Sequence, residues 1–172
     1  MEEINLRDLI KDYPDFPKQG IIFKDILPIL ANPESFAALI KKMASDDCIK
    51  RADALVGIDA RGFIFASCIG YELSKPIILA RKPGKLPGEI YTNSYSLEYG
   101  QNSLSIQKEA LEEYQTYVIV DDLLATGGTI DSVSKILLSQ DKQILGASVV
   151  VELSALKARE KLNLNIISQI SY

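Results

Sequence analysis

The 172-residue chain contains no histidine and no tryptophan, and it has only two cysteines, Cys48 and Cys68. The lack of histidine excludes catalytic triads built on imidazole and metal centres with histidine ligands. Any proton transfer must therefore be carried out by Asp, Glu, Lys or Tyr. The two cysteines do not have the spacing of zinc or redox motifs, so we predict reduced, structural thiols.

Long apolar runs and an excess of basic residues are also missing. No stretch approaches the ~20 apolar residues of a membrane span, and the Met1-Glu2-Glu3 start does not have the basic character of a secretion signal. The net charge of −4 gives no broad basic surface for nucleic acid. We therefore expect a cytoplasmic protein without membrane or nucleic-acid partners, folded as a single domain over residues 1–172.

The most informative stretch runs from Val118 to Thr129 and reads VIVDDLLATGGT. Its first three residues are apolar and β-branched, which is typical of a strand buried on both faces. After it, Ile130, Val133 and Leu137 recur at helical spacing. We therefore predict a buried strand that turns through a loop into a helix, as in α/β folds with a parallel sheet.

The loop in this stretch has the composition of an anion site. Glycine permits tight turns, and the N–H groups at a helix start bind anions well. The adjacent carboxylates of Asp121 and Asp122 repel phosphate, so they need hydroxyl donors or a cation such as Mg²⁺. Packing alone also produces glycine-rich turns, but the stretch is neither a Walker loop nor a G-x-G-x-x-G motif.

The whole stretch resembles the ribose 5-phosphate loop of the type I phosphoribosyltransferases. The resemblance implies that Asp121 and Asp122 hold the 2′ and 3′ hydroxyls of phosphoribosyl pyrophosphate. It also implies a Rossmann-like parallel sheet flanked by helices, with an N-terminal base-binding hood over residues 1–30 and a flexible lid over residues 81–95. The residues implied to hold the 5′-phosphate are Ala125, Thr126, Gly127, Gly128 and Thr129.

A second polar loop follows the apolar segment from Ala54 to Ile58, which we predict to be a strand. It carries Asp59 and Arg61, at the carboxyl end of that strand, where open α/β sheets bind ligands. A guanidinium there suits a pyrophosphate, although a surface ion pair between Asp59 and Arg61 is the simpler alternative. Resemblance to the pyrophosphate loop of the same family favours the binding role for both residues.

Residues 81–89 read RKPGKLPGE and combine three cations with turn residues. A solvated loop often has this composition, but a lid that closes over a polyanion also fits. In the family it resembles, Arg81, Lys82 and Lys85 neutralise pyrophosphate. Glu98 and Tyr99 follow at the end of this region. The resemblance places Glu98 over the base as the candidate for proton transfer, and Tyr99 in the lid; a plain exposed carboxylate is the alternative for Glu98.

The segment from Phe16 to Ile26 combines Pro17 and Gly20 with a run of apolar residues, so we predict an apolar loop on irregular backbone. Such a loop either fills a core or forms a flat slot for an aromatic base. It resembles the base-binding segment of the adenine phosphoribosyltransferases, apart from Gln19 in place of the usual Pro and Lys24 in place of the common Arg. The residues implied to bind adenine are Ile22 and Lys24 through their backbone, Phe23 by stacking, and Leu153 on the opposite face.

Together these resemblances imply purine salvage, in which adenine and phosphoribosyl pyrophosphate give AMP and pyrophosphate. They further imply a homodimer and Mg²⁺ held mainly by substrate oxygens, without a dedicated set of protein ligands. A transferase for 6-oxopurines is one alternative, although the apolar base loop lacks an evident donor for O6. A non-enzymatic sensor of phosphoribosyl pyrophosphate that binds nucleic acid is the other, and it would be expected to carry a basic surface.

Overall fold

The computed structural model describes residues 5–97 and 100–172. The chain divides into two compact units, residues 1–42 and 43–172. The predictions of one domain over 1–172 and of a hood over 1–30 stay predictions. The elements of the first unit are a 3-10 helix (Leu6–Leu9), β1 (Lys11–Pro14), β2 (Ile22–Asp25), α1 (Leu27–Ala31) and α2 (Pro33–Ala44), which continues past the boundary.

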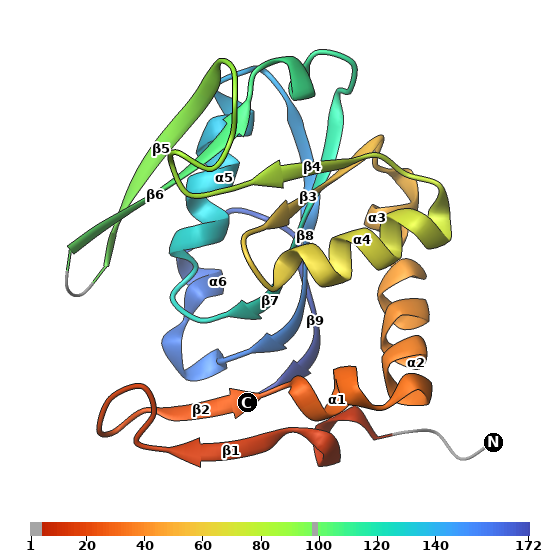
Figure 1. Ribbon diagram of the computed structural model, residues 1–172, viewed down its shortest axis with the longest axis vertical. Coiled ribbons are helices and arrows are strands. Elements are labelled where there is room, and N and C mark those ends of the chain that lie inside the picture. Colours follow the sequence, from red (N-terminus) through yellow and green to blue (C-terminus); the bar gives the residue numbers. More distant parts are fainter. Residues whose placement is uncertain (1–4, 98–99) are drawn as a thin grey trace. The chain divides into compact units, whose positions relative to one another are not determined.

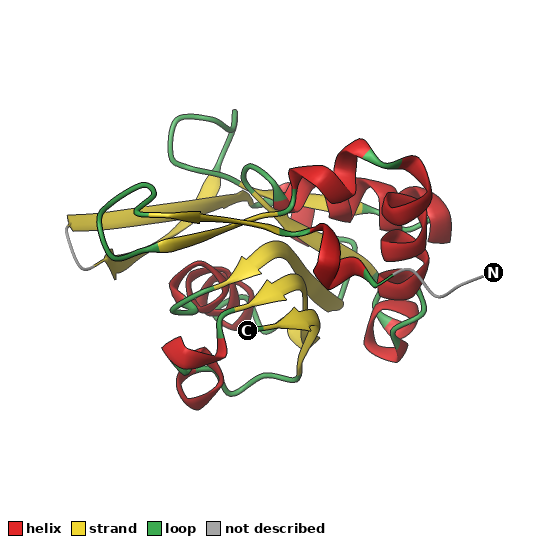
Figure 2. Ribbon diagram, turned by 90° about the horizontal axis from the view of Figure 1, so that it is seen from below, coloured by secondary structure: helices red, strands yellow, loops and turns green. Residues whose placement is uncertain are grey.

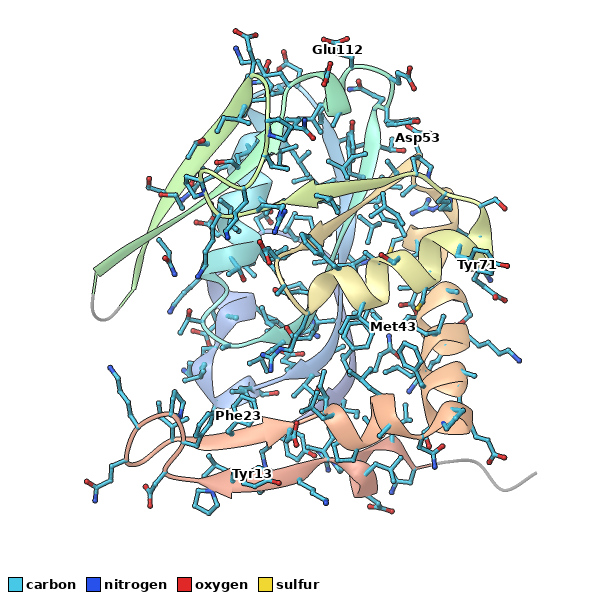
Figure 3. All side chains as sticks on the ribbon, viewed as in Figure 1. Tyr13, Phe23, Met43, Asp53, Tyr71 and Glu112 are labelled. Atoms are coloured by element: carbon cyan, nitrogen blue, oxygen red, sulfur yellow. The ribbon has the colours of Figure 1, made fainter. Side chains whose placement is uncertain are left out.

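β1 and β2 form an antiparallel pair in which Tyr13 lies opposite Phe23 and Asp12 opposite Lys24. The prediction of irregular backbone at residues 22–24 is therefore wrong. β-branched and aromatic residues favour a strand here, while Pro17 and Gly20 fall in the connection between the two strands. Figure 3 shows Phe23 on β2 and Tyr13 on β1.

The second unit is built on a five-stranded sheet in the order β4-β3-β7-β8-β9, with every neighbouring pair parallel (Figure 1). The prediction of a parallel sheet flanked by helices is confirmed. The strands are β3 (Ala54–Ile58), β4 (Ile77–Ala80), β7 (Thr116–Leu124), β8 (Gln143–Glu152) and β9 (Ile166–Ser171).

Helices cover both faces of this sheet (Figures 1 and 2). α3 (Asp47–Arg51) and α4 (Gly62–Leu73) lie on one face and α5 (Gly128–Leu138) on the other. All five residues of β3 are buried, as a strand covered on both faces requires. At the opposite end from the polar loops, Asp53 accepts hydrogen bonds from the backbone N–H groups of Gln115 and Thr116, which fixes the start of β3 against the start of β7.

A long antiparallel hairpin, β5 (Ile90–Leu97) and β6 (Gly100–Gln107), packs on α5 in the second unit. The Ser132 hydroxyl on α5 donates to the carbonyl of Asn93 on β5 at 3.0 Å. Residues 90–95, predicted as part of the lid loop, therefore belong to a strand, because they pair in register with β6. Glu98 and Tyr99 lie outside the described residues.

The remaining elements are short: 3-10 helices at Glu109–Leu111 and Ser154–Leu156, and α6 (Ala158–Lys161). Among the described residues, no helix has both the length and the apolar character needed to cross a membrane. Cys48 and Cys68 are both free thiols, and burial raises the pKa of each. The prediction of reduced cysteines agrees with this.

Candidate functional site

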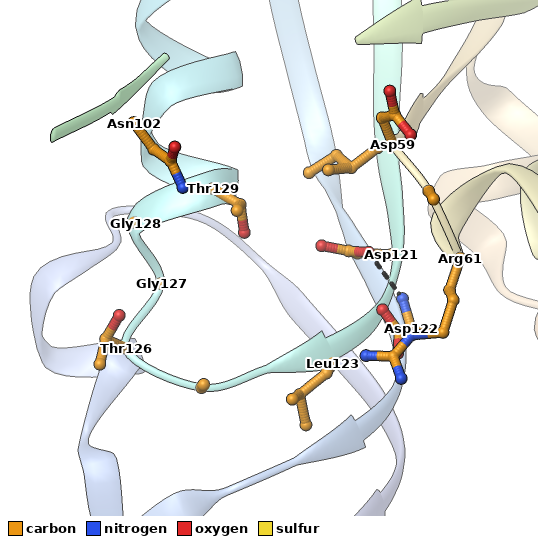
Figure 4. Close-up of a pocket in the computed structure, with 13 residues that line it drawn as sticks. Asp59, Arg61, Asn102, Asp121, Asp122, Leu123, Thr126, Gly127, Gly128 and Thr129 are labelled. Atoms are coloured by element: carbon orange, nitrogen blue, oxygen red, sulfur yellow. Dashed lines mark hydrogen bonds and ion pairs between the residues drawn. The ribbon is translucent and has the colours of Figure 1, made fainter. Parts of the chain in front are cut away.

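A pocket of about 410 Å³ opens at the carboxyl ends of β3 and β7 (Figure 4). Parallel strands place their following loops at one edge of the sheet, so two loops far apart in the sequence meet here. Nine of its lining residues are ones for which the sequence predicts a binding role: Asp59, Arg61, Asp121, Asp122, Ala125, Thr126, Gly127, Gly128 and Thr129. The other four are Ile58, Ala60, Asn102 and Leu123.

Residues Ala125–Thr129, called the phosphate loop below, connect β7 to the start of α5. Gly127 has a φ of +88°, a conformation that favours glycine, and a Cβ there would lie 3.0 Å from Leu162 Cδ1. α5 begins at Gly128, so its first N–H groups and the hydroxyls of Thr126 and Thr129 border the pocket. Such a helix start with flanking hydroxyls suits a phosphate group.

Asp121 and Asp122 form the acidic wall of the pocket and lie within β7, which continues to Leu124. Both are buried, and the backbone N–H of Asp122 donates to Asp121 Oδ1 at 2.9 Å. Burial, together with the charge of Asp122, raises the pKa of Asp121 well above its ordinary value. Asp121 is therefore a carboxylate whose charge the folded protein stabilises poorly.

The arginine of the second loop faces Asp122. Arg61 Nε lies 2.8 Å from Asp122 Oδ2, and the Arg61 side chain remains 39% exposed. The alternative considered from the sequence, an ion pair of Arg61 with Asp59, is not the one that forms. Asp59 instead pairs with Arg81, whose Nε lies 3.1 Å from Asp59 Oδ2. Asp122 and Asp59 are therefore each paired with an arginine distant in the sequence.

Gly62, directly after Arg61, lets α4 approach β7. A Cβ at this position would lie 2.8 Å from the carbonyl oxygen of Val120 and 3.0 Å from Asp121 Oδ1. Any side chain would therefore push the start of α4 away from β7. The glycine holds Arg61 within reach of the two carboxylates.

The lid cations do not line the pocket. Arg81 Nη1 donates to the carbonyl of Lys85 at 3.3 Å, and its guanidinium lies 5.7 Å from the centre of the Phe63 ring. An antiparallel bridge between Arg81 and Ser105 joins the start of the lid loop to β6. Lys82 and Lys85 are exposed to solvent. Of the three, Arg81 is joined to the pocket through its ion pair with Asp59.

The residues predicted to bind the base lie in different units of the chain. Ile22, Phe23 and Lys24 belong to β2 in the first unit, where the rings of Phe16 and Phe23 meet edge to face at 5.3 Å. Leu153 follows β8 in the second unit, and its N–H donates to the carbonyl of Leu124 at 2.9 Å. Ile22 and Lys24 are two apart in a strand, so their backbone groups point to the same edge of β2.

Asn102 is the polar pocket residue that sequence reasoning did not find. It lies on β6, opposite Tyr95 in the hairpin register, and Figure 4 shows it beside Thr129. The available signal was an amide side chain shortly after Glu98 and Tyr99 in the sequence. The contact depends on how the hairpin packs on α5, which local sequence does not specify.

The sequence and the fold of the chain both match those of known proteins. The family model described as phosphoribosyl transferase domain matches residues 27–168. The adenine phosphoribosyltransferase of Prochlorococcus marinus strain MIT 9515 is 57% identical over 170 residues, which covers 99% of both chains. The solved adenine phosphoribosyltransferase of Thermoanaerobacter pseudethanolicus is 41% identical with a TM-score of 0.91, over 97% of this chain and 98% of its own.

A third relative was solved with bound ligands. The adenine phosphoribosyltransferase of Saccharomyces cerevisiae, in complex with adenine and an imino-altritol bisphosphate, is 36% identical with a TM-score of 0.89, over 95% of this chain and 96% of its own. Both the sequence and the fold thus match one family over nearly the full length of the chain. The chain belongs to the phosphoribosyltransferase family and, within it, to the adenine phosphoribosyltransferases.

Proposed function

We propose that the pocket at the ends of β3 and β7 holds phosphoribosyl pyrophosphate, from which the chain transfers the 5-phosphoribosyl group to N9 of adenine. The products are AMP and pyrophosphate. The observation that carries this proposal is the meeting of an anion-binding helix start, two buried carboxylates and an arginine in one pocket. Those three features match, in order, the phosphate, the ribose hydroxyls and the pyrophosphate of one substrate.

The 5′-phosphate binds in the phosphate loop. Ala125, Gly127 and Gly128 leave space for close approach of the backbone, and the hydroxyls of Thr126 and Thr129 donate hydrogen bonds. α5 is 11 residues long, so the partial positive charge at its start adds to the attraction. No lysine or arginine is needed at this end of the substrate.

Asp121 and Asp122 accept hydrogen bonds from the 2′ and 3′ hydroxyls of the ribose. Carboxylates repel the phosphate groups but bind hydroxyl donors well, so the acidic wall orients the sugar between its two anionic ends. Donation from the ribose stabilises the charge of Asp121, which burial and Asp122 disfavour in the free protein. Asp122 keeps Arg61 close to the C1 side of the sugar until substrate arrives.

The pyrophosphate binds at the Asp59–Arg61 loop, with Arg81, Lys82 and Lys85 of the lid as further cations. Arg61 and Arg81 are paired with Asp122 and Asp59, so binding exchanges these carboxylates for pyrophosphate oxygens. Lys82 and Lys85 are exposed, and their long side chains can extend toward the pyrophosphate when the loop closes. Neutralising the departing pyrophosphate lowers the barrier to its release.

We also propose that the reaction requires Mg²⁺, which the same pocket suits. Mg²⁺ keeps several waters and binds through one or two carboxylates together with substrate phosphates. Among residues 5–97 and 100–172, no cluster of three or more Cys, Asp or Glu side chains offers a metal site. Asp121 and Asp122 are the carboxylates able to support an ion carried in mainly by substrate oxygens. When bound, it neutralises negative charge on the pyrophosphate.

For the base, we propose that Phe23 stacks on adenine, that the backbone of Ile22 and Lys24 reads its edge, and that Leu153 contacts the ring. The shared direction of the Ile22 and Lys24 backbone groups on β2 supports this role. The complex of the yeast relative with adenine supports the choice of base. A hood over residues 1–30 and a lid over the loop of residues 81–89, within one domain of 172 residues, are part of the same proposal.

In the transfer step N9 forms a bond to C1 of the ribose, while the bond from C1 to the pyrophosphate oxygen breaks and its electron pair leaves with pyrophosphate. Adenine loses one proton, which we assign to Glu98, with Tyr99 closing the lid. Pyrophosphate is a good leaving group, so holding the reactants in line accounts for much of the acceleration. Glu98→Gln should lower kcat and flatten its pH profile; wild-type kcat at every pH would exclude this assignment.

We also propose a cytoplasmic homodimer. Exposed apolar side chains on α4, Ile64 and Tyr71, offer surface for a second copy, and Figure 3 shows Tyr71 pointing away from the helix. Sedimentation of the purified chain tests this directly, because a dimer of a 19.0 kDa chain has twice its mass. A monomer at micromolar concentration would contradict it.

The reaction is tested by following product formation from phosphoribosyl pyrophosphate with adenine or with hypoxanthine, in the presence of Mg²⁺. We expect AMP from adenine, little product from hypoxanthine, and loss of activity when a chelator removes the metal. Preference for hypoxanthine would indicate a 6-oxopurine transferase. Binding of phosphoribosyl pyrophosphate without product from either base would indicate a sensor instead of an enzyme.

A further inference from the structure

We infer that Arg159, outside the pocket, is a positioning residue that holds the phosphate loop in its ligand-binding shape by clamping α6 to the end of β8 and to β9. The inference rests on the proposed function of the phosphate loop as the site of the ribose 5-phosphate. Arg159 does not line the pocket, so its effect must pass through the elements it holds.

Arg159 makes a planar, two-pronged contact with Glu152 at the end of β8. Its Nε donates to Glu152 Oε1 and its Nη2 to Glu152 Oε2, both at 2.7 Å. The remaining nitrogen, Nη1, donates to the carbonyl of Ile166 on β9 at 2.8 Å. Ser168 of β9 completes the group, because its hydroxyl donates to Glu152 Oε2 at 2.7 Å. One guanidinium thus joins α6 to two strands.

The clamped elements touch the phosphate loop at two places. At its start, Glu152 is the register partner of Leu124, and the N–H of Leu153 donates to the Leu124 carbonyl. In its middle, Gly127 lies directly against α6 and the residue after it. A Cβ on Gly127 would be 3.4 Å from Ala158 Cβ and 3.0 Å from Leu162 Cδ1. Ala158 and Leu162 flank the clamp residue in sequence.

This contact differs from an ordinary surface ion pair. The Glu152 side chain is only 6% exposed, whereas the Arg51–Asp47 pair on α3 has side chains 65% and 83% exposed. The hydrogen bonds from Arg159 lower the pKa of Glu152 and raise that of Arg159, so each charge stabilises the other. Two-pronged geometry also fixes orientation, which a single exposed contact does not.

The expected effect is selective. Loosening α6 lets the backbone around Gly127 relax, and small displacements of binding groups reduce affinity strongly. The Asp59–Arg61 loop follows β3, which β7 separates from β8 in the sheet, so pyrophosphate binding should be preserved. A residue that supports only general stability would weaken both ligands together.

The experiment measures the dissociation constants of ribose 5-phosphate and of magnesium pyrophosphate by calorimetry for wild type, Arg159→Met and Arg159→Lys. Arg51→Met is the matched control, because it removes an exposed arginine ion pair far along the chain. Circular dichroism of each variant checks the fold. Arg159→Lys keeps the charge and the apolar stem while losing the two-pronged contact, so it serves if Arg159→Met does not fold.

We expect affinity for ribose 5-phosphate to fall about tenfold in Arg159→Met and less in Arg159→Lys, with unchanged affinity for pyrophosphate and no change in Arg51→Met. In steady-state assays KM for phosphoribosyl pyrophosphate should rise more than kcat falls. Unchanged affinity for ribose 5-phosphate, or an equal loss for both ligands, would overturn the inference. Failure of the wild type itself to bind ribose 5-phosphate would instead refute the proposed function of the loop.

Discussion

Two buried carboxylates on neighbouring strands, Asp121 on β7 and Glu152 at the end of β8, differ in their surroundings although they are similarly buried, at 7% and 5% exposure. Glu152 has both oxygens bonded to Arg159, which lowers its pKa. Asp121 lies beside the like charge of Asp122 in a buried position, which raises its pKa.

The difference distinguishes a carboxylate that supports the fold from one that belongs to the binding site. Glu152 is compensated within the protein, so its charge contributes to the native structure. Asp121 is poorly compensated, and such groups gather where a ligand later supplies the missing partner. For Asp121 the partner that fits is a hydroxyl of the ribose, or a cation that accompanies the substrate.

The largest effect is expected for the double substitution Asp121→Asn with Asp122→Asn, which removes the acidic wall. Affinity for phosphoribosyl pyrophosphate should fall about 100-fold, because hydrogen bonds to charged groups contribute about 1.5–3 kcal/mol each. Calorimetric titration measures this, with Asp47→Asn as control for an exposed carboxylate on α3. Wild-type affinity in the double variant would exclude a role for either residue in binding ribose.

Glu152→Gln should destabilise the protein by about 1–2 kcal/mol at pH 7, a value limited by solvent around the half-exposed Arg159. Because the folded state lowers the pKa of Glu152 below its ordinary 4.5, its stabilising contribution is present above that value and is lost as the pH falls through the folded-state pKa. Urea unfolding at pH 7 and at progressively lower pH should therefore show the variant converging on wild type. Glu160→Gln is the control, because Glu160 belongs to an exposed ion pair with Lys157. If the free energy of unfolding of the variant were lower than that of wild type by the same amount at every pH, the charge of Glu152 would not be the cause.

The smallest effect is expected for Asp121→Asn alone. This substitution should raise the stability of the protein, whereas Glu152→Gln lowers it. The folded state raises the pKa of Asp121 above its ordinary 3.8, so its contribution to stability is lost as the pH rises through the folded-state pKa. Removing the charge should therefore stabilise the ligand-free protein at pH 8 by about 1 kcal/mol, as single stabilising substitutions commonly do. The gain should vanish below about pH 4. Urea unfolding of both proteins across this range measures it.

The parts of the site encoded in one continuous stretch were predictable. The strand over Ala54–Ile58 and the step from β7 through the phosphate loop to α5 depend on local periodicity and on glycine, so the sequence predicts them closely. Asp121 and Asp122 were predicted to follow the strand, and β7 continues through them because its register with β8 extends to Leu124.

The pairing of side chains across the fold was not predictable. Arg61 pairs with Asp122 and Arg81 with Asp59 only because parallel strands bring those segments to one edge of the sheet. Asn102 reaches the pocket through the hairpin on α5, and β2 forms because β1 is available as its partner. Contacts of this kind depend on tertiary packing, which no short window of sequence contains.

The most direct test of the account is the thermal unfolding of wild type and Asp121→Asn at pH 8, each with and without phosphoribosyl pyrophosphate and Mg²⁺. A ligand that binds the folded state stabilises it by RT ln(1 + [L]/Kd), so the gain from ligand reports affinity while the ligand-free midpoint reports stability. We predict that Asp121→Asn melts above wild type without ligand and gains less from ligand than wild type does. A variant that melts below wild type without ligand, or that gains as much from ligand, would contradict the account.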